Sequence, residues 1–169
     1  MIAAIVRRAR FFLLCAILAG GIAFAAWFAD RQATTLVGAA RVIDGDSLLV
    51  AGTEIRLFGI DAPELAQVCT RASRLWNCGA EAAETLRAAV AGREVACRPR
   101  EQDRYGRTVA ICHARGLDLG AAMVKGGFAV AYGAYEADER EARDARRGIW
   151  SSSFDRPATW RARHPRPDR

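Results

Sequence analysis

The sequence predicts a small α+β domain: a five-stranded β-barrel with about three helices, preceded by an apolar N-terminal helix. Residues 36–60 are rich in Val, Ile and Leu and are interrupted by glycines, which is typical of short consecutive strands. A segment of helical periodicity at residues 79–90 separates these strands from a second apolar pair. The order of three strands, a helix and two strands favours a closed barrel of the OB type over a parallel βαβ sheet.

The first three strands are placed by their turn residues. Asp44-Gly45 indicates a sharp bend or bulge, and Ala51-Gly52-Thr53 indicates a hairpin turn. Strands are therefore expected near residues 36–43, 46–51 and 54–60. Residues 62–78, which hold a proline and two cysteines, are expected to form a loop.

The second half of the domain starts with the helix expected over residues 79–90, which carries Glu81 and Glu84 in its first turn. Strands near 93–99 and 107–114 follow, joined by a turn at 102–106. Asp118 is expected to cap a short helix that stops at Gly126-Gly127.

The chain then continues with an extended piece and a last helix. The extended piece is expected over residues 128–132 and the helix over 136–147, with Gly148 as its C-terminal cap. The arginine-bearing tail from residue 151 is expected to pack loosely or to be mobile. The predicted divisions are 1–30 (signal or anchor), 31–35 (linker), 36–150 (barrel domain) and 151–169 (basic tail).

The N-terminal segment has the pattern of an export signal. Arg7, Arg8 and Arg10 precede residues 11–28, which contain no charge, and Asp30-Arg31 ends the run. This pattern predicts a cleaved secretory signal or a retained membrane anchor, and the two are left open. In both cases the remaining chain lies outside the cytoplasm, either periplasmic or secreted, or anchored to the membrane and facing outward.

The positive charge is not spread over the domain. The chain carries a net charge of +6, but residues 30–150 hold 17 Lys+Arg and 17 Asp+Glu, so the excess lies at the two ends. A uniformly basic binding face is therefore not predicted. An anionic substrate would have to be held by a few well-placed cations, by a metal, or by the tail.

The cysteines predict two disulfide bonds. Four cysteines follow the apolar segment, and an even number in an exported small domain suggests disulfides. Cys97 and Cys112 lie symmetrically about the turn at 104–105, so they are expected to face each other across a hairpin. Cys69 is predicted to pair with Cys78. The alternative, a zinc site, lacks a short C-x-x-C pair.

Three acids are expected to meet at one end of the second hairpin. With a turn at residues 51–53, Asp46 lies beside the end of the following strand, close to Asp61 and Glu64. Three carboxylates repel one another unless a positive group lies among them, and a hard cation such as Ca²⁺ prefers oxygen ligands. Arg56 lies on the same hairpin, but its face depends on the register of the turn. The alternative is that these are ordinary surface turn acids.

Three segments together resemble the signatures of the staphylococcal nuclease (thermonuclease) family. They are Val42-Ile43-Asp44-Gly45-Asp46-Ser47, Ile55-Arg56-Leu57-Phe58-Gly59-Ile60-Asp61-Ala62-Pro63-Glu64 and Asp103-Arg104-Tyr105-Gly106-Arg107. They occur in the family's order and at similar spacing, and the resemblance covers about residues 36–150. It implies an OB-fold barrel and Ca²⁺-dependent cleavage of DNA or RNA.

The resemblance also implies roles for individual residues. Asp46 and Asp61 would be calcium ligands, together with the backbone carbonyl of Ala62, where the family often has threonine. Glu64 would be the general base, and Arg56 and Arg107 the phosphate clamps.

Four further residues would bind the substrate. Arg104 and Tyr105 would touch the nucleotide phosphate and sugar, and Tyr132 and Tyr135 resemble the family's base-stacking pair, with an alignment open by one residue. The cysteine-bearing loop at 65–78 and the tail at 151–169 depart from the family pattern.

The main alternative is a non-catalytic OB-fold module that only binds nucleic acid. Such modules lose catalytic acids and arginines, whereas this chain has all five catalytic and liganding side chains. The expected partners are therefore DNA or RNA as substrate, and the membrane if the N-terminal segment is retained. No protein partner is implied.

Overall fold

The computed structural model describes residue 21 and residues 34–165. The predicted signal or anchor at residues 1–30 lies outside the described residues, apart from residue 21, and stays a prediction. Within the described residues, no helix has both the length and the apolar character needed to cross a membrane. The account below concerns residues 35–165, which form one compact unit.

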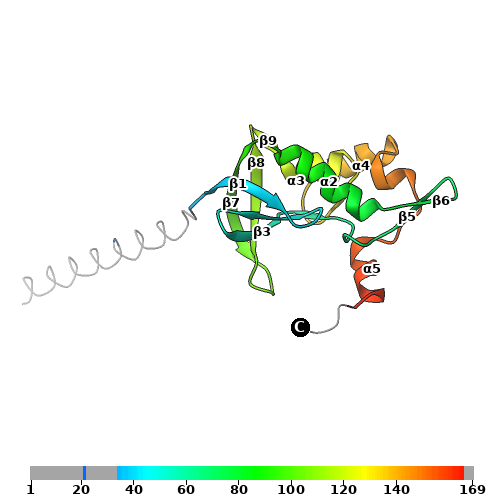
Figure 1. Cartoon of the computed structure of the whole chain (residues 1–169), viewed down its shortest axis with the longest axis horizontal. Coiled ribbons are helices and arrows are strands. Elements are labelled where there is room, and N and C mark those ends of the chain that lie inside the picture. Colours follow the sequence, from blue (N-terminus) through cyan, green and yellow to red (C-terminus); the bar gives the residue numbers. More distant parts are fainter. Residues whose placement is uncertain (1–20, 22–33, 166–169) are drawn as a thin grey trace, which may run out of the picture. The chain divides into compact units, whose positions relative to one another are not determined.

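Five strands close into the predicted barrel (Figure 1). Antiparallel pairing joins β3 to β2, β2 to β1, β1 to β7 and β7 to β8, and a parallel pairing of β3 with β8 closes the ring. The strands are β1 Leu36–Val42, β2 Ser47–Val50, β3 Thr53–Leu57, β7 Glu94–Gln102 and β8 Thr108–Ala114, with β9 Leu117–Asp118 added beside β8. This closed arrangement is consistent with the expected OB-type barrel.

The core lies inside the barrel and under two helices. Alternate apolar side chains of the strands point inward, and Leu48, Ile55 and Val95 are fully buried. Helix α2, Cys78–Val90, contributes Leu86 to this core, and α3, Leu119–Lys125, contributes Met123. As predicted, Asp118 caps α3, because its side chain accepts a hydrogen bond from the Ala121 N–H.

Two parts of the chain are more ordered than the sequence indicated. The predicted loop at 62–78 contains a small hairpin of β5, Cys69–Arg71, and β6, Arg74–Trp76. The tail, expected to be loose or mobile, forms helix α5, Pro157–Arg163. The described residues therefore hold four α-helices where about three were expected, because Pro157 provides a helix start that the basic composition obscured.

The predicted last helix is shorter than expected. Helix α4, Glu136–Asp144, ends before residue 147, and Gly148 starts the 3₁₀ helix η1, Gly148–Ser151, instead of capping α4. Gly148 has a φ of +51° and approaches Gly127 so closely that a side chain at position 148 would collide with the Gly127 carbonyl. This close approach explains the change of direction at the end of α4.

Both predicted disulfides are present, Cys69–Cys78 and Cys97–Cys112. Cys97 and Cys112 are direct partners in the β7–β8 ladder. The turn itself is centred on Tyr105, because the Asp103 N–H donates to the Arg107 carbonyl at 3.0 Å. A bulge between Pro99 and Glu101 shifts the register by one residue and restores the cysteine pairing.

The β5–β6 loop and the tail bind each other, and we call residues 65–78 and 149–163 together the loop–tail layer. Thr70 and Ser153 exchange two backbone hydrogen bonds, at 2.9 and 2.8 Å. The Trp76 indole N–H donates to the Ser152 hydroxyl at 2.9 Å. Beneath them, a small apolar cluster contains the Cys69–Cys78 bond, Val130, Ile149, Trp76, Trp150 and Phe154.

Candidate active site

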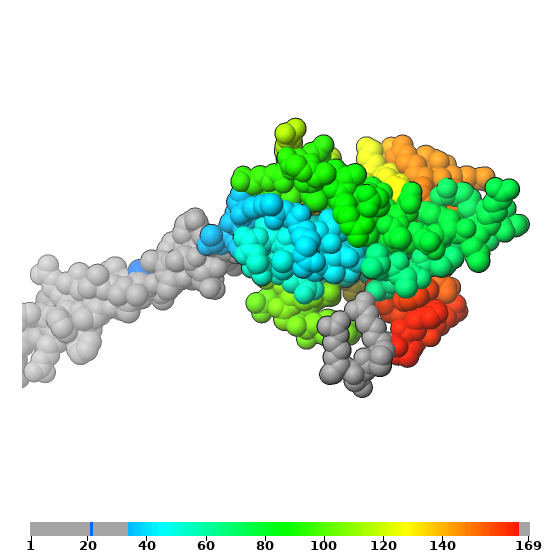
Figure 2. Space-filling view, in the orientation of Figure 1, coloured from blue at the N-terminus to red at the C-terminus, as the bar shows by residue number. Residues whose placement is uncertain are grey.

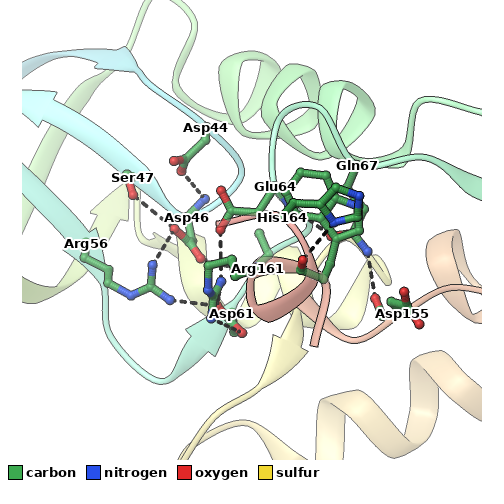
Figure 3. A network of polar contacts seen from close by, with 12 residues as sticks. Asp44, Asp46, Ser47, Arg56, Asp61, Glu64, Gln67, Asp155, Arg161 and His164 are labelled. Carbon is green, nitrogen blue, oxygen red and sulfur yellow. Dashed lines mark hydrogen bonds and ion pairs between the residues drawn. The ribbon is translucent and has the colours of Figure 1, made fainter. Parts of the chain in front are cut away.

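The β2–β3 hairpin brings the predicted acids and Arg56 together (Figure 3). Ser47 pairs with Arg56 in the ladder, and the Leu57 N–H donates to the Asp46 carbonyl at 2.8 Å. This register resolves the face of Arg56, which the sequence left open. The guanidinium lies between Asp46 and Asp61, with Nη1 3.0 Å from Asp46 Oδ1 and Nη2 2.9 Å from Asp61 Oδ1.

Asp46 is buried and fully hydrogen-bonded. Its Oδ1 accepts from the Ser47 hydroxyl at 3.0 Å, in addition to Arg56, and its Oδ2 accepts from the Ala62 N–H at 2.9 Å. Gly45 permits this close packing, since a Cβ at that position would lie 2.7 Å from the Ala62 side chain. Burial raises the pKa of Asp46 to about 7, against the lowering effect of Arg56.

Asp61 is placed by a short strand. Strand β4, Ile60–Asp61, pairs with β10, Val130–Ala131, and this pairing fixes the backbone directly after the β3 hairpin. The Asp61 side chain is buried and accepts hydrogen bonds from two arginines, Arg56 of the barrel and Arg161 of the tail.

Arg161 was not among the predicted site residues. Its Nη1 lies 2.9 Å from Asp61 Oδ1 and 3.0 Å from Glu64 Oε1, and its Nη2 lies 3.0 Å from Asp61 Oδ2. Hydrogen bonds to Asp61 and Glu64 raise the pKa of Arg161, so the group stays charged. The only sequence signal was the clustering of arginines in the tail, which has no spacing that relates it to residues 61–64.

Glu64 is positioned by Gln67, another residue that the sequence analysis missed. The buried Gln67 side chain accepts from the Glu64 N–H at 3.2 Å, and the Gln67 N–H donates to the Glu64 carbonyl at 2.7 Å. Its amide also donates to the Asp155 carbonyl at 2.7 Å. Gly79 leaves room for this turn, because a Cβ there would collide with the Glu64 carbonyl.

The chemistry of the acids fits a hard cation. Asp46 and Asp61 offer carboxylate oxygens on either side of one guanidinium, and oxygen ligands suit Ca²⁺ or a similar ion. Over residues 34–165 there is no cluster of three or more Asp, Glu, His or Cys side chains arranged for a metal. A cation would therefore need further ligands from main-chain carbonyls, such as that of Ala62, or from water.

Arg107 lies at the β7–β8 turn with Arg104 and Tyr105. The Arg107 Nε–H donates to Asp103 Oδ2 at 2.8 Å, and the Arg107 backbone N–H donates to Asp103 Oδ1 at 3.0 Å. The Arg104 guanidinium lies 4.8 Å from the centre of the exposed Tyr105 ring. In the described part of the chain, Arg107 is thus paired with its own turn and does not join the carboxylate network.

The two predicted stacking tyrosines lie in different surroundings. Tyr132 follows β10 and is 75% exposed, so its ring is accessible to a ligand. Tyr135 packs its ring against Gly59 and Gly120, and its hydroxyl donates to Asp118 at 3.0 Å. Burial and the contact with Asp118 raise the pKa of Tyr135 above its usual range. Tyr135 therefore contributes to the packing between the barrel and α3.

Comparisons with known proteins relate most of the domain to one family. The sequence model of the family described as "Staphylococcal nuclease homologue" matches residues 54–152. That range includes Arg56, Asp61, Glu64 and Arg107, whereas Asp46 precedes it.

Individual relatives cover the domain to different extents. A succinoglycan biosynthesis protein of Rhizobium meliloti (strain 1021) is 36% identical over 126 residues, covering 70% of this chain and 66% of the relative. An uncharacterized endonuclease of Escherichia coli O157:H7 is 33% identical, covering 73% of this chain and 82% of the relative. A probable staphylococcal-like nuclease of Oryza sativa subsp. japonica is 34% identical, but the chain spans only 35% of its length.

Proposed function

This chain belongs to the nuclease family of staphylococcal nuclease homologues, and we propose that it is a calcium-dependent nuclease that hydrolyses phosphodiester bonds of DNA or RNA. The observation that carries the proposal is the network of Asp46, Arg56 and Asp61, which Arg161 connects to Glu64. It unites two potential cation ligands, a phosphate-binding guanidinium and a further carboxylate within one site.

In this proposal Glu64 is the general base. A water molecule attacks phosphorus as Glu64 accepts its proton, and one P–O ester bond breaks as the leaving oxygen takes a proton from solvent water; Glu64 then returns its proton to solvent. Glu64 suits this role because Gln67 and Gly79 hold its backbone at the edge of the site. Asp46 and Asp61, with the Ala62 carbonyl, would hold Ca²⁺, which when bound supplies positive charge to the phosphoryl oxygens.

Arg56 and Arg107 are proposed to bind the phosphate. A guanidinium presents two parallel N–H groups that match two phosphoryl oxygens, and the charge on these oxygens grows during attack. The Arg56 guanidinium already lies among the carboxylates of the site. Arg107 is paired with Asp103, and it would have to leave that carboxylate to bind a phosphate of the substrate. Arg104 and Tyr105 of the same turn, and the exposed ring of Tyr132, would contact the nucleotide.

Plasmid cleavage tests the proposal directly. Supercoiled DNA is incubated with the purified chain in Ca²⁺ and in excess chelator, and we expect cleavage only with Ca²⁺. Glu64→Gln should lose about 10²–10⁴-fold in rate while keeping Ca²⁺ affinity, because only the proton acceptor is removed. Asp46→Asn should lose both rate and Ca²⁺ affinity. The matched control is Glu54→Gln, an exposed acid on β3, which should leave both unchanged.

Two results would contradict these assignments. If Glu64→Gln loses calcium affinity as severely as Asp46→Asn, Glu64 is a ligand and the base lies elsewhere. If the chain binds nucleic acid but never cleaves it, the domain is the non-catalytic binding module.

We also propose that the domain is exported. The apolar segment after Arg10 supports export, and the two disulfide bonds suit an oxidising compartment. Alkaline phosphatase fused after residue 35 should be active. An inactive fusion, beside an active cytoplasmic reporter at the same position, would reject export.

A further inference from the structure

The tail arginine Arg161 binds the carboxylates that the proposed function assigns to calcium and to the general base. Its two terminal nitrogens approach the two oxygens of Asp61 as a parallel pair, at 2.9 and 3.0 Å, and Nη1 also reaches Glu64 at 3.0 Å. Figure 3 shows the guanidinium beside Asp61, below Glu64. Such a bidentate pair is the strongest form of arginine–carboxylate contact.

We propose that helix α5 is an internal competitor for calcium: Arg161 occupies Asp61 and Glu64, and Ca²⁺ must displace it to bind. Asp61 Oδ1 accepts from both Arg56 and Arg161, and Oδ2 accepts from Arg161. A cation that binds Asp61 therefore competes with Arg161 for the same lone pairs of the carboxylate. This inference rests on the proposed function, because it concerns the same carboxylates.

Charge makes the competition direct. Arg161 pairs with both Asp61 and Glu64, so its positive charge lies where a cation bound to Asp61 would also lie. A divalent cation placed beside Asp61 would be repelled by Arg161 and attracted more strongly once that arginine has left. The Glu64 oxygen that accepts from Arg161 would also be released to accept a proton from water.

The attachment of α5 is suited to release. The chain before α5 is held to the loop by the Thr70–Ser153 pair and by the Gln67 bond to the Asp155 carbonyl. The helix itself is seven residues long and begins at Pro157, and the Arg161 side chain is 39% exposed. Figure 2 shows α5, coloured red, at the surface of the domain. Pro157 is buried and Arg156 lies 3.7 Å from Glu139, so the start of the helix also stays attached. Residues 158–163 are the part that would move while the preceding segment remains bound.

Calcium binding to the full chain tests this proposal. We compare wild type, Arg161→Gln, Arg161→Lys and the control Arg163→Gln by isothermal titration calorimetry. Arg163 lies on the same helix but pairs with Asp155, outside the carboxylate site. We expect Arg161→Gln to bind Ca²⁺ about tenfold more tightly, Arg161→Lys to fall between it and wild type, and Arg163→Gln to match wild type. Hydrogen exchange should show faster exchange of the α5 amides of wild type when Ca²⁺ is added.

The outcomes separate this proposal from the proposed function. If wild type binds Ca²⁺ and Arg161→Gln binds it equally or more weakly, the competitor role is overturned while the calcium site stands. If neither chain binds Ca²⁺, both proposals fail. Unchanged α5 exchange in saturating Ca²⁺ would also overturn the displacement, whatever the affinity of the variant.

Discussion

Two regions of the molecule supply an arginine to the same carboxylate, and they hold that arginine very differently. Arg56 lies on β3 inside the barrel ladder, and its side chain is 20% exposed between two buried acids. Arg161 lies on a seven-residue helix of the loop–tail layer and is 39% exposed. Both make hydrogen bonds to Asp61 of 2.9 to 3.0 Å.

The difference shows that hydrogen-bond length alone does not distinguish a permanent part of a site from a removable one. The Arg56 side chain projects from a strand of the closed barrel and is paired with two buried acids, Asp46 and Asp61. In the competitor proposal, Arg161 leaves when α5 moves, and the barrel ladder stays intact. The predictions below separate the contributions of the barrel from those of the loop–tail layer.

The largest difference is expected between the two arginines themselves. Arg56→Gln should lower kcat about 10²–10³-fold and the free energy of unfolding by roughly 3 kcal/mol, because it leaves the buried Asp46 without its guanidinium partner. Arg161→Gln should lower the free energy of unfolding by less than about 1 kcal/mol, since its pair is partly screened by water. Plasmid cleavage in Ca²⁺ measures the change in kcat, and urea unfolding in the presence of chelator measures the change in the free energy of unfolding. A loss of stability in Arg161→Gln equal to that in Arg56→Gln would make the tail arginine part of the permanent structure.

The two disulfides should have similar effects on stability and different effects on the tail. Replacing either cysteine pair by serines should cost about 3 kcal/mol in the chain-entropy model, because the closed loops are of similar length. Only loss of Cys69–Cys78 should speed hydrogen exchange in residues 149–163, since that bond lies within the loop–tail layer and packs against Ile149. Equal exchange of the tail in both double variants would show that the loop does not anchor it.

Gln67 joins the two regions, and its removal should have an intermediate effect. Gln67→Leu leaves the Glu64 N–H and the Asp155 carbonyl without the amide that now binds them, which should cost about 1–3 kcal/mol in the free energy of unfolding. Cleavage should also slow, because the backbone of Glu64 is less well held. The control Gln102→Leu, at an exposed position of β7, should be near neutral. Full activity in a destabilised Gln67→Leu would limit Gln67 to a structural role.

The smallest effects are expected for the two tyrosines. Tyr135→Phe should lower the free energy of unfolding by about 1 kcal/mol, because the Asp118 carboxylate loses a buried donor, and should leave KM nearly unchanged. Tyr132→Ala should leave stability unchanged and raise KM roughly tenfold if its exposed ring stacks on a base. Steady-state kinetics and thermal unfolding check both, and the reverse pattern would assign the stacking role to Tyr135.

Much of the site was predictable because its residues are close in sequence or share a ladder. The hairpin turn at residues 51–53 was sufficient to bring Asp46 toward Asp61. The turn between β7 and β8 placed Cys97 and Cys112 on facing strands, but their direct pairing also needs the bulge between Pro99 and Glu101, which the sequence did not indicate. The face of Arg56 was not predictable, because a shift of one residue in the turn would reverse it. The three family signatures identified the acids without establishing any distance between them.

The sequence by itself determined the barrel, its family and the group of acids, since each depends on local periodicity, turn residues or contiguous motifs. Only the tertiary structure revealed that Arg161 lies against Asp61 and Glu64, about a hundred residues earlier in the chain. No local pattern encodes that contact. It depends on the β5–β6 hairpin, on the pairing of Thr70 with Ser153 and on the turn of the chain into α5. The hairpin and the helix are local, but the pairing of Thr70 with Ser153 joins backbone groups that are distant in sequence and meet only when the domain has folded.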